Sequence, residues 1–125
     1  MEKNMMTIAV RDLAEITVID LSGRMIGNAS NEFLVTASAV IVEGGARKMI
    51  INMKALEQCD SMGISALLRL HGSLQNMEGR LILCNLNELV TKVFALTHIN
   101  EVMNIVAVED DALEALGVTS VIHGA

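Results

Sequence analysis

The sequence predicts an α/β fold with a mixed, mostly parallel β-sheet and about four helices packed mainly on one face. Short runs rich in Ile, Val and Leu alternate with amphipathic segments of helical spacing. The first two runs are close together, as in an antiparallel hairpin, whereas helices separate the later ones, as in parallel strands joined by right-handed crossovers. The chain has 125 residues, so we expect a single domain over residues 1–125 with its own hydrophobic core.

An antiparallel hairpin is expected at the start of the chain. Two runs rich in Ile, Val and Thr cover residues 6–10 and 15–21, and the four residues from Arg11 to Ala14 are expected to form the turn. Two glycines within residues 22–28 interrupt the strand pattern and predict a loop. A helix with apolar residues at helical spacing follows, and it stops at Gly44-Gly45.

The central part of the chain predicts a buried strand followed by an amphipathic helix. Residues 48–53 are apolar enough to be covered on both faces of a sheet. From about Ser61 to Met77, apolar residues recur on one side of a helix and polar residues on the other. We expect this helix to end at Gly79, which can adopt a left-handed backbone conformation.

The last third of the chain predicts two further strand and helix pairs. The expected elements are a strand over residues 80–85, a helix capped by Asn87 and carrying Phe94, a strand over residues 102–108, and a short helix over residues 112–116 opened by Asp110-Asp111. Residues 118–125 are expected to form a frayed, flexible tail. We find no internal repeat and no linker.

Composition indicates the kind of core and excludes one class of partner. Apolar residues make up 52% of the chain, but Phe33 and Phe94 are its two aromatic residues, so the core must be aliphatic and rich in Met. The formal charge is −6 and no cluster of Lys and Arg is present, which argues against nucleic-acid binding.

The cysteines and the absence of apolar leaders favour a cytoplasmic protein. Cys59 and Cys84 lack a C-x-x-C pairing, so we expect two buried, unpaired thiols in a reducing compartment. No charged-then-apolar leader is present, and no run approaches the roughly 18 apolar residues of a membrane span. We expect no membrane insertion.

Ser61 is the chemically suggestive residue because it lies where the central helix begins. The first N–H groups of a helix lack internal partners and carry about half a positive charge, which stabilises an oxygen or a phosphate there. One interpretation is structural, with Ser61 as an N-cap worth about 1 kcal/mol. The other is regulatory phosphorylation, which adds a charge of about −1.5 to −2 and three acceptor oxygens.

A nucleophilic-serine enzyme is the competing chemical interpretation, and the sequence argues against it. Such an enzyme needs an oriented general base, but His71 is more than two turns along the helix, and His98 and His123 are remote in sequence. Ser61 also lacks the G-x-S-x-G elbow. We therefore predict that the chain is not an enzyme.

Metal and cofactor sites are not predicted either. The His, Cys and carboxylate residues do not provide three or four ligands at a suitable spacing. Gly23 and Gly27 are expected to be turn residues, because no G-x-x-x-x-G-K-[ST] motif is present.

Residues 49–63 resemble the STAS domain of bacterial anti-sigma factor antagonists. The family motif is an apolar strand, a short link and then Asp-Ser-Ser-Gly leading a helix, and Asp60-Ser61-Met62-Gly63 stands at its place here. Residues 21–23, 79–84 and 93–97 are similar to other parts of the family, so the resemblance covers nearly the whole chain. It implies the STAS (SpoIIAA-like) fold.

The resemblance also implies a function. Ser61 matches the serine that accepts phosphate from an ATP-using anti-sigma factor serine kinase, and the unphosphorylated antagonist binds that kinase to release a sigma factor. A PP2C-type phosphatase is the implied second partner. We expect a docking face on residues 22–28, residues 60–63 and the exposed side of the central helix. Its expected contact residues are Ser22, Gly23, Arg24, Met25, Asn28, Asp60, Ser61, Met62, Gly63, Ser65 and Arg69.

Two departures from the family pattern leave an alternative open. Met62 replaces the second motif serine, and Arg24 stands where the family commonly has an acidic residue. STAS domains also serve as non-phosphorylated scaffolds or interaction modules in stress-signalling, transporter and lipid-transport complexes, which is the alternative function. We expect a monomer, with a weak homodimer through an exposed sheet face as the other possibility.

Overall fold

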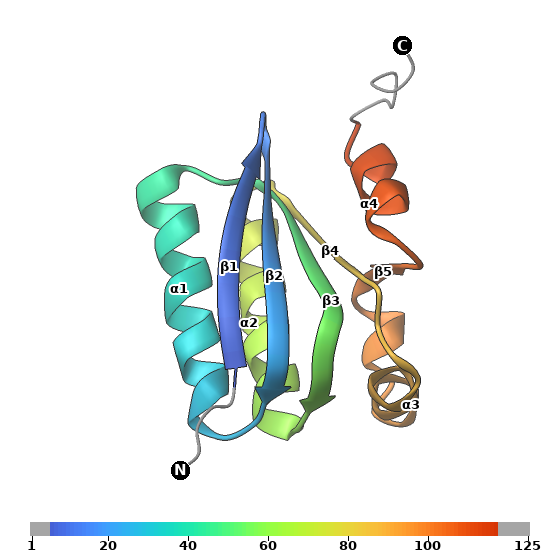
Figure 1. Cartoon of the computed structure of the whole chain (residues 1–125). Helices are drawn as coiled ribbons and strands as arrows, with labels where there is room; N and C mark the ends of the chain where they lie inside the picture. The colour runs from blue at the N-terminus through green and yellow to red at the C-terminus, as the bar shows by residue number, and fades with distance from the viewer. Residues whose placement is uncertain (1–5, 118–125) are drawn as a thin grey trace.

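The computed structural model describes residues 6–117, and it contains a five-stranded sheet and four α-helices (Figure 1). The elements in chain order are β1 (Met6–Leu13), β2 (Ile16–Met25), α1 (Asn28–Gly44), β3 (Lys48–Cys59), α2 (Ser61–Asn76), β4 (Arg80–Cys84), α3 (Glu88–Leu96), the 3₁₀ turn η1 (Ile99–Glu101), β5 (Asn104–Val106) and α4 (Glu109–Ala115). The predicted tail at residues 118–125 lies outside the described residues.

The sheet is mixed and mostly parallel, which confirms the predicted fold class. Its strand order is β1-β2-β3-β4-β5, with β1 antiparallel to β2 and the remaining pairs parallel. The hairpin turn was predicted over the four residues Arg11 to Ala14, but the observed turn is only the two residues between Leu13 and Ile16. Arg11 and Asp12 continue β1 and pair with β2, and the chain reverses at Ala14, whose φ is 58°.

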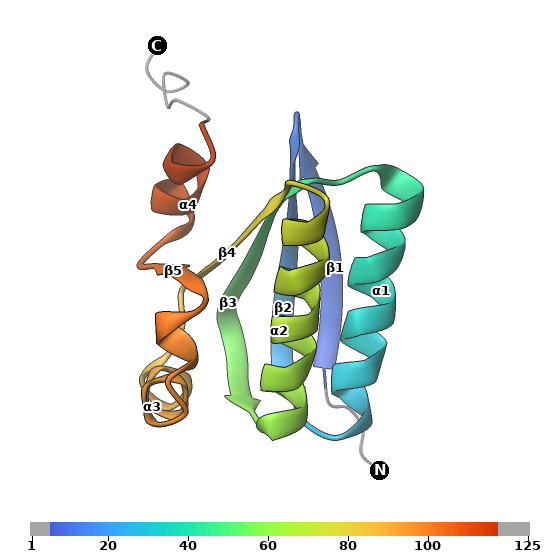
Figure 2. The same ribbon diagram turned by 180° about the vertical axis from the view of Figure 1, so that it is seen from behind.

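The helices divide unequally between the two faces of the sheet. Buried residues of α1, α2 and α3 form the larger hydrophobic cluster with one face, and Figure 2 shows α1 and α2 lying across it. The opposite face is covered by α4, where Ala112 and Leu116, the residue just after the helix, form a cluster with Ile16, Val18 and Ile50. Since successive strand residues point to opposite faces, Ile50 belongs to the smaller cluster while Met49 and Ile51 belong to the larger one.

A charged cluster fixes the start of α4 to the sheet. The Arg11 guanidinium donates hydrogen bonds to Asp20 at 2.6 and 2.9 Å, and to Glu109 at 2.6 and 3.3 Å. Asn52 donates to the same Glu109 carboxylate at 2.8 Å. The hydrogen bond from Arg11 lowers the pKa of Glu109 below its ordinary value, against the opposite effect of partial burial. The cluster thereby joins β1, β2 and β3 to α4.

Two strands are longer than predicted, and this changes the surroundings of the candidate site. β2 continues to Met25 and β3 to Cys59, so the predicted loop at residues 22–28 is a strand for its first half. The register shifts between Asp20 and Ser22, and again between Gly23 and Arg24. These irregularities explain why the strand pattern appears broken in the sequence.

The remaining differences concern element ends. The left-handed residue after α2 is Glu78, with φ of 61°, and not Gly79. Gly79 is needed because a Cβ there would collide with the Arg47 carbonyl oxygen, which accepts a hydrogen bond from the Arg80 N–H at 2.8 Å. The last strand is shorter than predicted, and α4 begins at Glu109.

Candidate functional site

The site is built around the N-terminus of α2, where Asp60 is the N-cap. One Asp60 oxygen, Oδ1, accepts hydrogen bonds from the backbone N–H groups of Met62 and Gly63, both at 3.0 Å. The residue has an extended backbone, as N-caps usually do. Asp60 therefore caps two N–H groups of the first helical turn that have no partner within the helix, and Ser61 does not act as the N-cap.

The second oxygen of Asp60 joins this turn to the neighbouring one. Oδ2 accepts a hydrogen bond from the Gly27 N–H at 3.0 Å, and the Asp60 N–H donates to the Met25 carbonyl at 3.3 Å. Gly27, with φ of 56°, is the residue before α1. The β2–α1 turn and the β3–α2 turn are thus held side by side at one end of the sheet (Figure 1).

Ser61 is the first residue of α2 and is exposed. Its hydroxyl makes no hydrogen bond with any residue between 6 and 117, because the neighbouring carboxylate already holds the N–H groups that it would otherwise cap. The side chain is therefore free to meet another molecule. An oxygen with this placement can accept a phosphoryl group without breaking an existing contact.

The expected contact residues differ in accessibility. Six of them are exposed, namely Arg24, Asn28, Ser61, Met62, Ser65 and Arg69. Ser22, Gly23 and Asp60 are partly buried, and the first two lie within β2 and not in a loop.

Met25 and Gly63 are corrections to the expected exposed docking face. The Met25 side chain is completely buried in the core, and Gly63 is buried in the first turn of α2. A Cβ on Gly63 would stand 2.6 Å from the Cys59 sulfur and 2.9 Å from the Met25 carbonyl oxygen. Gly63 therefore allows α2 to approach β2 and β3 closely, and both residues lie beneath the exposed surface of the site.

A small pocket lies between α1 and α2, and Met62, the residue after Ser61, is part of its lining. It has a volume of about 130 Å³, and its lining includes Met62, Ser65 and Arg69 from α2. From α1 it is lined by Ser30, Asn31 and Leu34, which sequence analysis did not identify. Many helices have polar residues in their first turn, so the sequence did not indicate that these three residues line a pocket.

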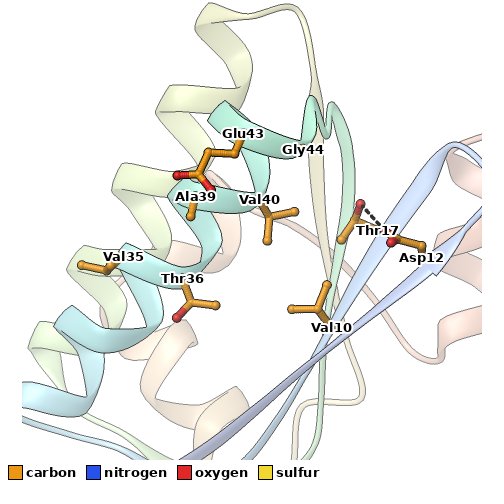
Figure 3. A pocket seen from close by; sticks show the side chains of 9 residues that line it. All are labelled: Val10, Asp12, Thr17, Val35, Thr36, Ala39, Val40, Glu43 and Gly44. Atoms are coloured by element: carbon orange, nitrogen blue, oxygen red, sulfur yellow. Dashed lines mark hydrogen bonds between the residues drawn. The ribbon is translucent and has the colours of Figure 1, made fainter.

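A second, larger hollow lies elsewhere on the molecule. Figure 3 shows it between the β1–β2 hairpin and the later part of α1, with a volume of about 630 Å³. Val10, Val35 and Val40 form its apolar lining, and Thr17 donates a long hydrogen bond of 3.4 Å to Asp12. This hollow shares no lining residue with the pocket between α1 and α2.

The other candidate reactive groups are not arranged for catalysis at Ser61. His71 is buried ten residues along α2, which is roughly 15 Å along the helix axis and beyond hydrogen-bond reach of Ser61. His98 Nδ1 is 3.0 Å from a Glu101 oxygen, and His123 lies outside the described residues. Between residues 6 and 117, no three His, Cys, Asp or Glu side chains are placed to hold a metal ion.

Both cysteines are buried and unpaired, which confirms the prediction for these two residues. Burial, assisted by the Asp60 carboxylate, raises the pKa of Cys59 to about 12. Burial and the charges of Glu109 and Asp20 raise the pKa of Cys84 to about 12. Because thiolates and not thiols are nucleophiles, neither cysteine is a reactive group at neutral pH.

No helix within residues 6–117 combines the length and apolar character needed to cross a membrane. The candidate site itself is formed by the starts of two helices and the ends of two strands.

Comparison with known proteins gives a consistent family assignment. The model of the STAS domain family matches residues 7–112. A crystal structure of an anti-sigma factor antagonist from Mycobacterium paratuberculosis is similar with a TM-score of 0.80 at 21% identity, covering 89% of this chain and 93% of that one. At this identity the likeness concerns the fold.

Two further solved structures are similar at slightly higher identity. An anti-sigma-factor antagonist (STAS) domain protein from Planctomyces limnophilus has a TM-score of 0.74 at 26% identity, covering 88% of this chain and 97% of that one. The Bacillus cell fate determinant SpoIIAA, solved in its phosphorylated form, has a TM-score of 0.68 at 25% identity, covering 87% of this chain and 98% of its own.

Proposed function

Because the chain belongs to the STAS domain family, we propose that it is an anti-sigma factor antagonist whose partner binding is switched off by phosphorylation of Ser61. The family assignment agrees with the resemblance seen in the Asp60 to Gly63 motif. One observation supports the switch most directly: the exposed Ser61 hydroxyl is unbonded between residues 6 and 117, while Asp60 caps the helix. Modification therefore leaves the cap intact.

The unphosphorylated form binds an anti-sigma factor that is also a serine kinase, and this binding frees a sigma factor. The docking face is the exposed surface formed by Arg24, Asn28, Ser61, Met62, Ser65 and Arg69. Met62 is 53% exposed and supplies an apolar contact on this otherwise polar surface. Asp60 acts indirectly, since it holds both turns of the face in place.

Phosphorylation opposes docking for an electrostatic reason. The phosphate brings a charge of about −1.5 to −2 to a surface that must be desolvated when the partner binds. Its desolvation costs free energy, and acidic partner groups are repelled. The similar SpoIIAA chain has been solved in a phosphorylated form, which supports the fold's ability to carry this modification. A PP2C-type phosphatase would reset the switch, and the cycle belongs in the cytoplasm.

Phosphate transfer to Ser61 is the direct test of this proposal. The purified chain is incubated with ATP and an anti-sigma kinase encoded beside its gene, and the product is mapped by mass spectrometry. We expect a single phosphate on Ser61, no incorporation in Ser61→Ala, and unchanged incorporation in the neighbouring control Ser65→Ala. Transfer to Ser65, or no transfer by a kinase that binds the chain, would rule the switch out.

A non-phosphorylated STAS scaffold is the second candidate, and two observations favour it. Met62 replaces the second hydroxyl of the family motif, and Arg24 places a positive charge on the docking face. A scaffold would use the same face for a constitutive complex in a stress-signalling, transporter or lipid-transport assembly. Its complex would be equally stable with ATP and with a non-hydrolysable ATP analogue, whereas the switch releases the partner only with ATP.

A further inference from the structure

The pocket between α1 and α2 contains a buried polar group without a partner. Ser30 is 2% exposed, and its hydroxyl has no hydrogen-bond partner between residues 6 and 117. Burying a hydroxyl without a hydrogen-bond partner is energetically unfavourable. Ser30 lines the pocket together with the exposed residues Asn31 and Ser65, so three polar residues border the same space.

The pocket also has an unpaired positive charge. Arg69 lines it and is exposed, and it forms no ion pair or side-chain hydrogen bond with residues 6–117. Arginine is suited to carboxylates because its planar guanidinium can donate two parallel hydrogen bonds. In a chain with a net charge of −6, an available arginine beside a buried hydroxyl selects for an anionic group.

The size of the pocket restricts what can enter it. Its volume of about 130 Å³ is below the roughly 300 Å³ at which pockets for cofactors and drug-sized ligands begin. A single side chain fits this space. Met62 and the partly buried Leu34 also line the pocket and can contact the methylene groups of such a side chain.

We propose that this pocket receives a glutamate or aspartate side chain of the docking partner. The carboxylate would pair with Arg69 and accept hydrogen bonds from Ser30, Asn31 or Ser65. This inference rests on the proposed docking function, because Met62 belongs both to the pocket and to the surface beside Ser61. The partner is therefore a protein that places an acidic residue next to the switch serine.

The same arrangement links the pocket to the switch. Ser61, Ser65 and Arg69 are four residues apart, so they lie along one side of α2. A phosphate on Ser61 places negative charge at one end of the row that receives the partner's carboxylate. The two anions repel each other. The phosphate also attracts the Arg69 guanidinium, which then interacts less strongly with the carboxylate. Phosphorylation thus weakens a specific contact.

The test uses a model carboxylate and needs neither kinase nor partner. The full-length ¹⁵N-labelled chain is titrated with N-acetyl-glutamate N-methylamide and followed by NMR, with the glutamine analogue as the uncharged probe. We expect millimolar binding with shifts in residues 30–34 and 62–69, and at least fivefold weaker binding of the glutamine analogue. Equal binding of both probes, or shifts confined to other residues, would overturn the proposal.

Matched variants separate the pocket from general charge effects. Arg69→Gln should weaken binding of the glutamate probe at least fivefold. Lys48→Gln removes a positive charge at the first residue of β3 and should leave the binding of the probe unchanged. Ser30→Ala should weaken the probe severalfold while the melting temperature stays equal or rises, because an unpaired hydroxyl is removed. A purely structural role for Ser30 predicts unchanged probe binding, which would contradict the inference.

Inorganic phosphate serves as a third probe. We expect it to compete with the glutamate probe for Arg69, so that the two shift the same amides. If phosphate binds and the glutamate probe does not, the pocket is a small-anion site and not a docking subsite. Failure of these titrations is distinguishable from failure of the proposed switch, because phosphate transfer to Ser61 by the kinase is measured separately, without any carboxylate probe.

Discussion

Asp60 holds three backbone N–H groups from two neighbouring turns, while the adjacent Ser61 hydroxyl holds none between residues 6 and 117. The difference follows from geometry, because the N-cap residue and the first helical residue point their side chains in different directions. The start of the helix was predicted correctly from the sequence. The sequence left two roles open for Ser61, an N-cap and a phosphorylation site. The structure assigns the capping hydrogen bonds to Asp60.

This division of roles predicts different costs for two neighbouring substitutions. Asp60→Ala should lower the free energy of unfolding by about 1–2 kcal/mol, because it removes the cap and the contact to Gly27. Ser61→Ala should change it by less than about 0.5 kcal/mol. Urea unfolding of both variants measures the difference. Equal costs would show that Ser61 is itself a cap.

Two glycines of α2, Gly63 and Gly72, should respond in opposite ways to substitution by alanine. Gly63→Ala should destabilise the fold by about 1–3 kcal/mol, because the new methyl group would meet the Cys59 sulfur and the Met25 carbonyl. Gly72→Ala meets no atom within 4 Å and should stabilise the helix by about 0.5–1 kcal/mol. Thermal unfolding of the two variants should therefore shift the midpoint in opposite directions. Shifts of the same sign would contradict the close approach described at Gly63.

At the scale of secondary-structure elements, α4 depends on a small number of contacts with the second face of the sheet. It has seven residues, and isolated helices of that length are not stable. Its buried contacts come from Ala112 and from Leu116 just after the helix, and its first residue, Glu109, accepts hydrogen bonds from Arg11 and Asn52. The start of this helix is therefore anchored by charge, which makes its contribution sensitive to pH.

The pH dependence has a definite sign. The pKa of Glu109 is lower in the folded protein than in the unfolded chain, so its stabilising contribution is present above the unfolded value of about 4.3 and is lost as the pH falls through the folded value. Glu109→Gln should cost on the order of 1 kcal/mol at pH 7, since Arg11 is 41% exposed and screened by solvent. The loss of unfolding free energy caused by Glu109→Gln should become smaller at acidic pH.

Unfolding in urea at a series of pH values, with Glu114→Gln as the control, measures this contribution. Glu114 is exposed on the same helix, and its carboxylate forms no hydrogen bond or ion pair with residues 6–117. The control should match the original protein at each pH. A Glu109→Gln cost that stays constant from pH 7 into the acid range would contradict the role of the ion pair.

Element boundaries show what could be predicted from sequence at this scale. The helices near the site and the parallel strands follow from their apolar spacing, and the Asn87 cap of α3 was predicted and is observed, with its oxygen accepting from the Val90 N–H at 2.7 Å. The ends of β2 and β3 were not predicted, because polar residues and glycine in these stretches are tolerated by pairing between strands that are distant in sequence. Long-range pairing is not encoded in local composition.

At the scale of the whole molecule, the fold brings together two turns that are about thirty residues apart in sequence, as the Gly27 to Asp60 contact shows. Family resemblance indicated Ser61 and the residues around it. The α1 side of the pocket, with Ser30 and Asn31, was not predictable, because α1 and α2 pack through residues whose spacing predicts only that each helix is amphipathic. The docking face is a product of this tertiary packing.

The affinity of the cognate anti-sigma factor for two forms of the protein tests the central claim most directly. The unmodified chain and a chain carrying phosphoserine only at position 61 are titrated into the partner by calorimetry, with phosphoserine at position 65 as the charge-matched control. We expect phosphoserine at position 61 to weaken binding at least tenfold, which corresponds to about 1.4 kcal/mol of binding free energy. Phosphoserine at position 65 should weaken binding less. Equal affinities of the unmodified and Ser61-phosphorylated forms would contradict the account.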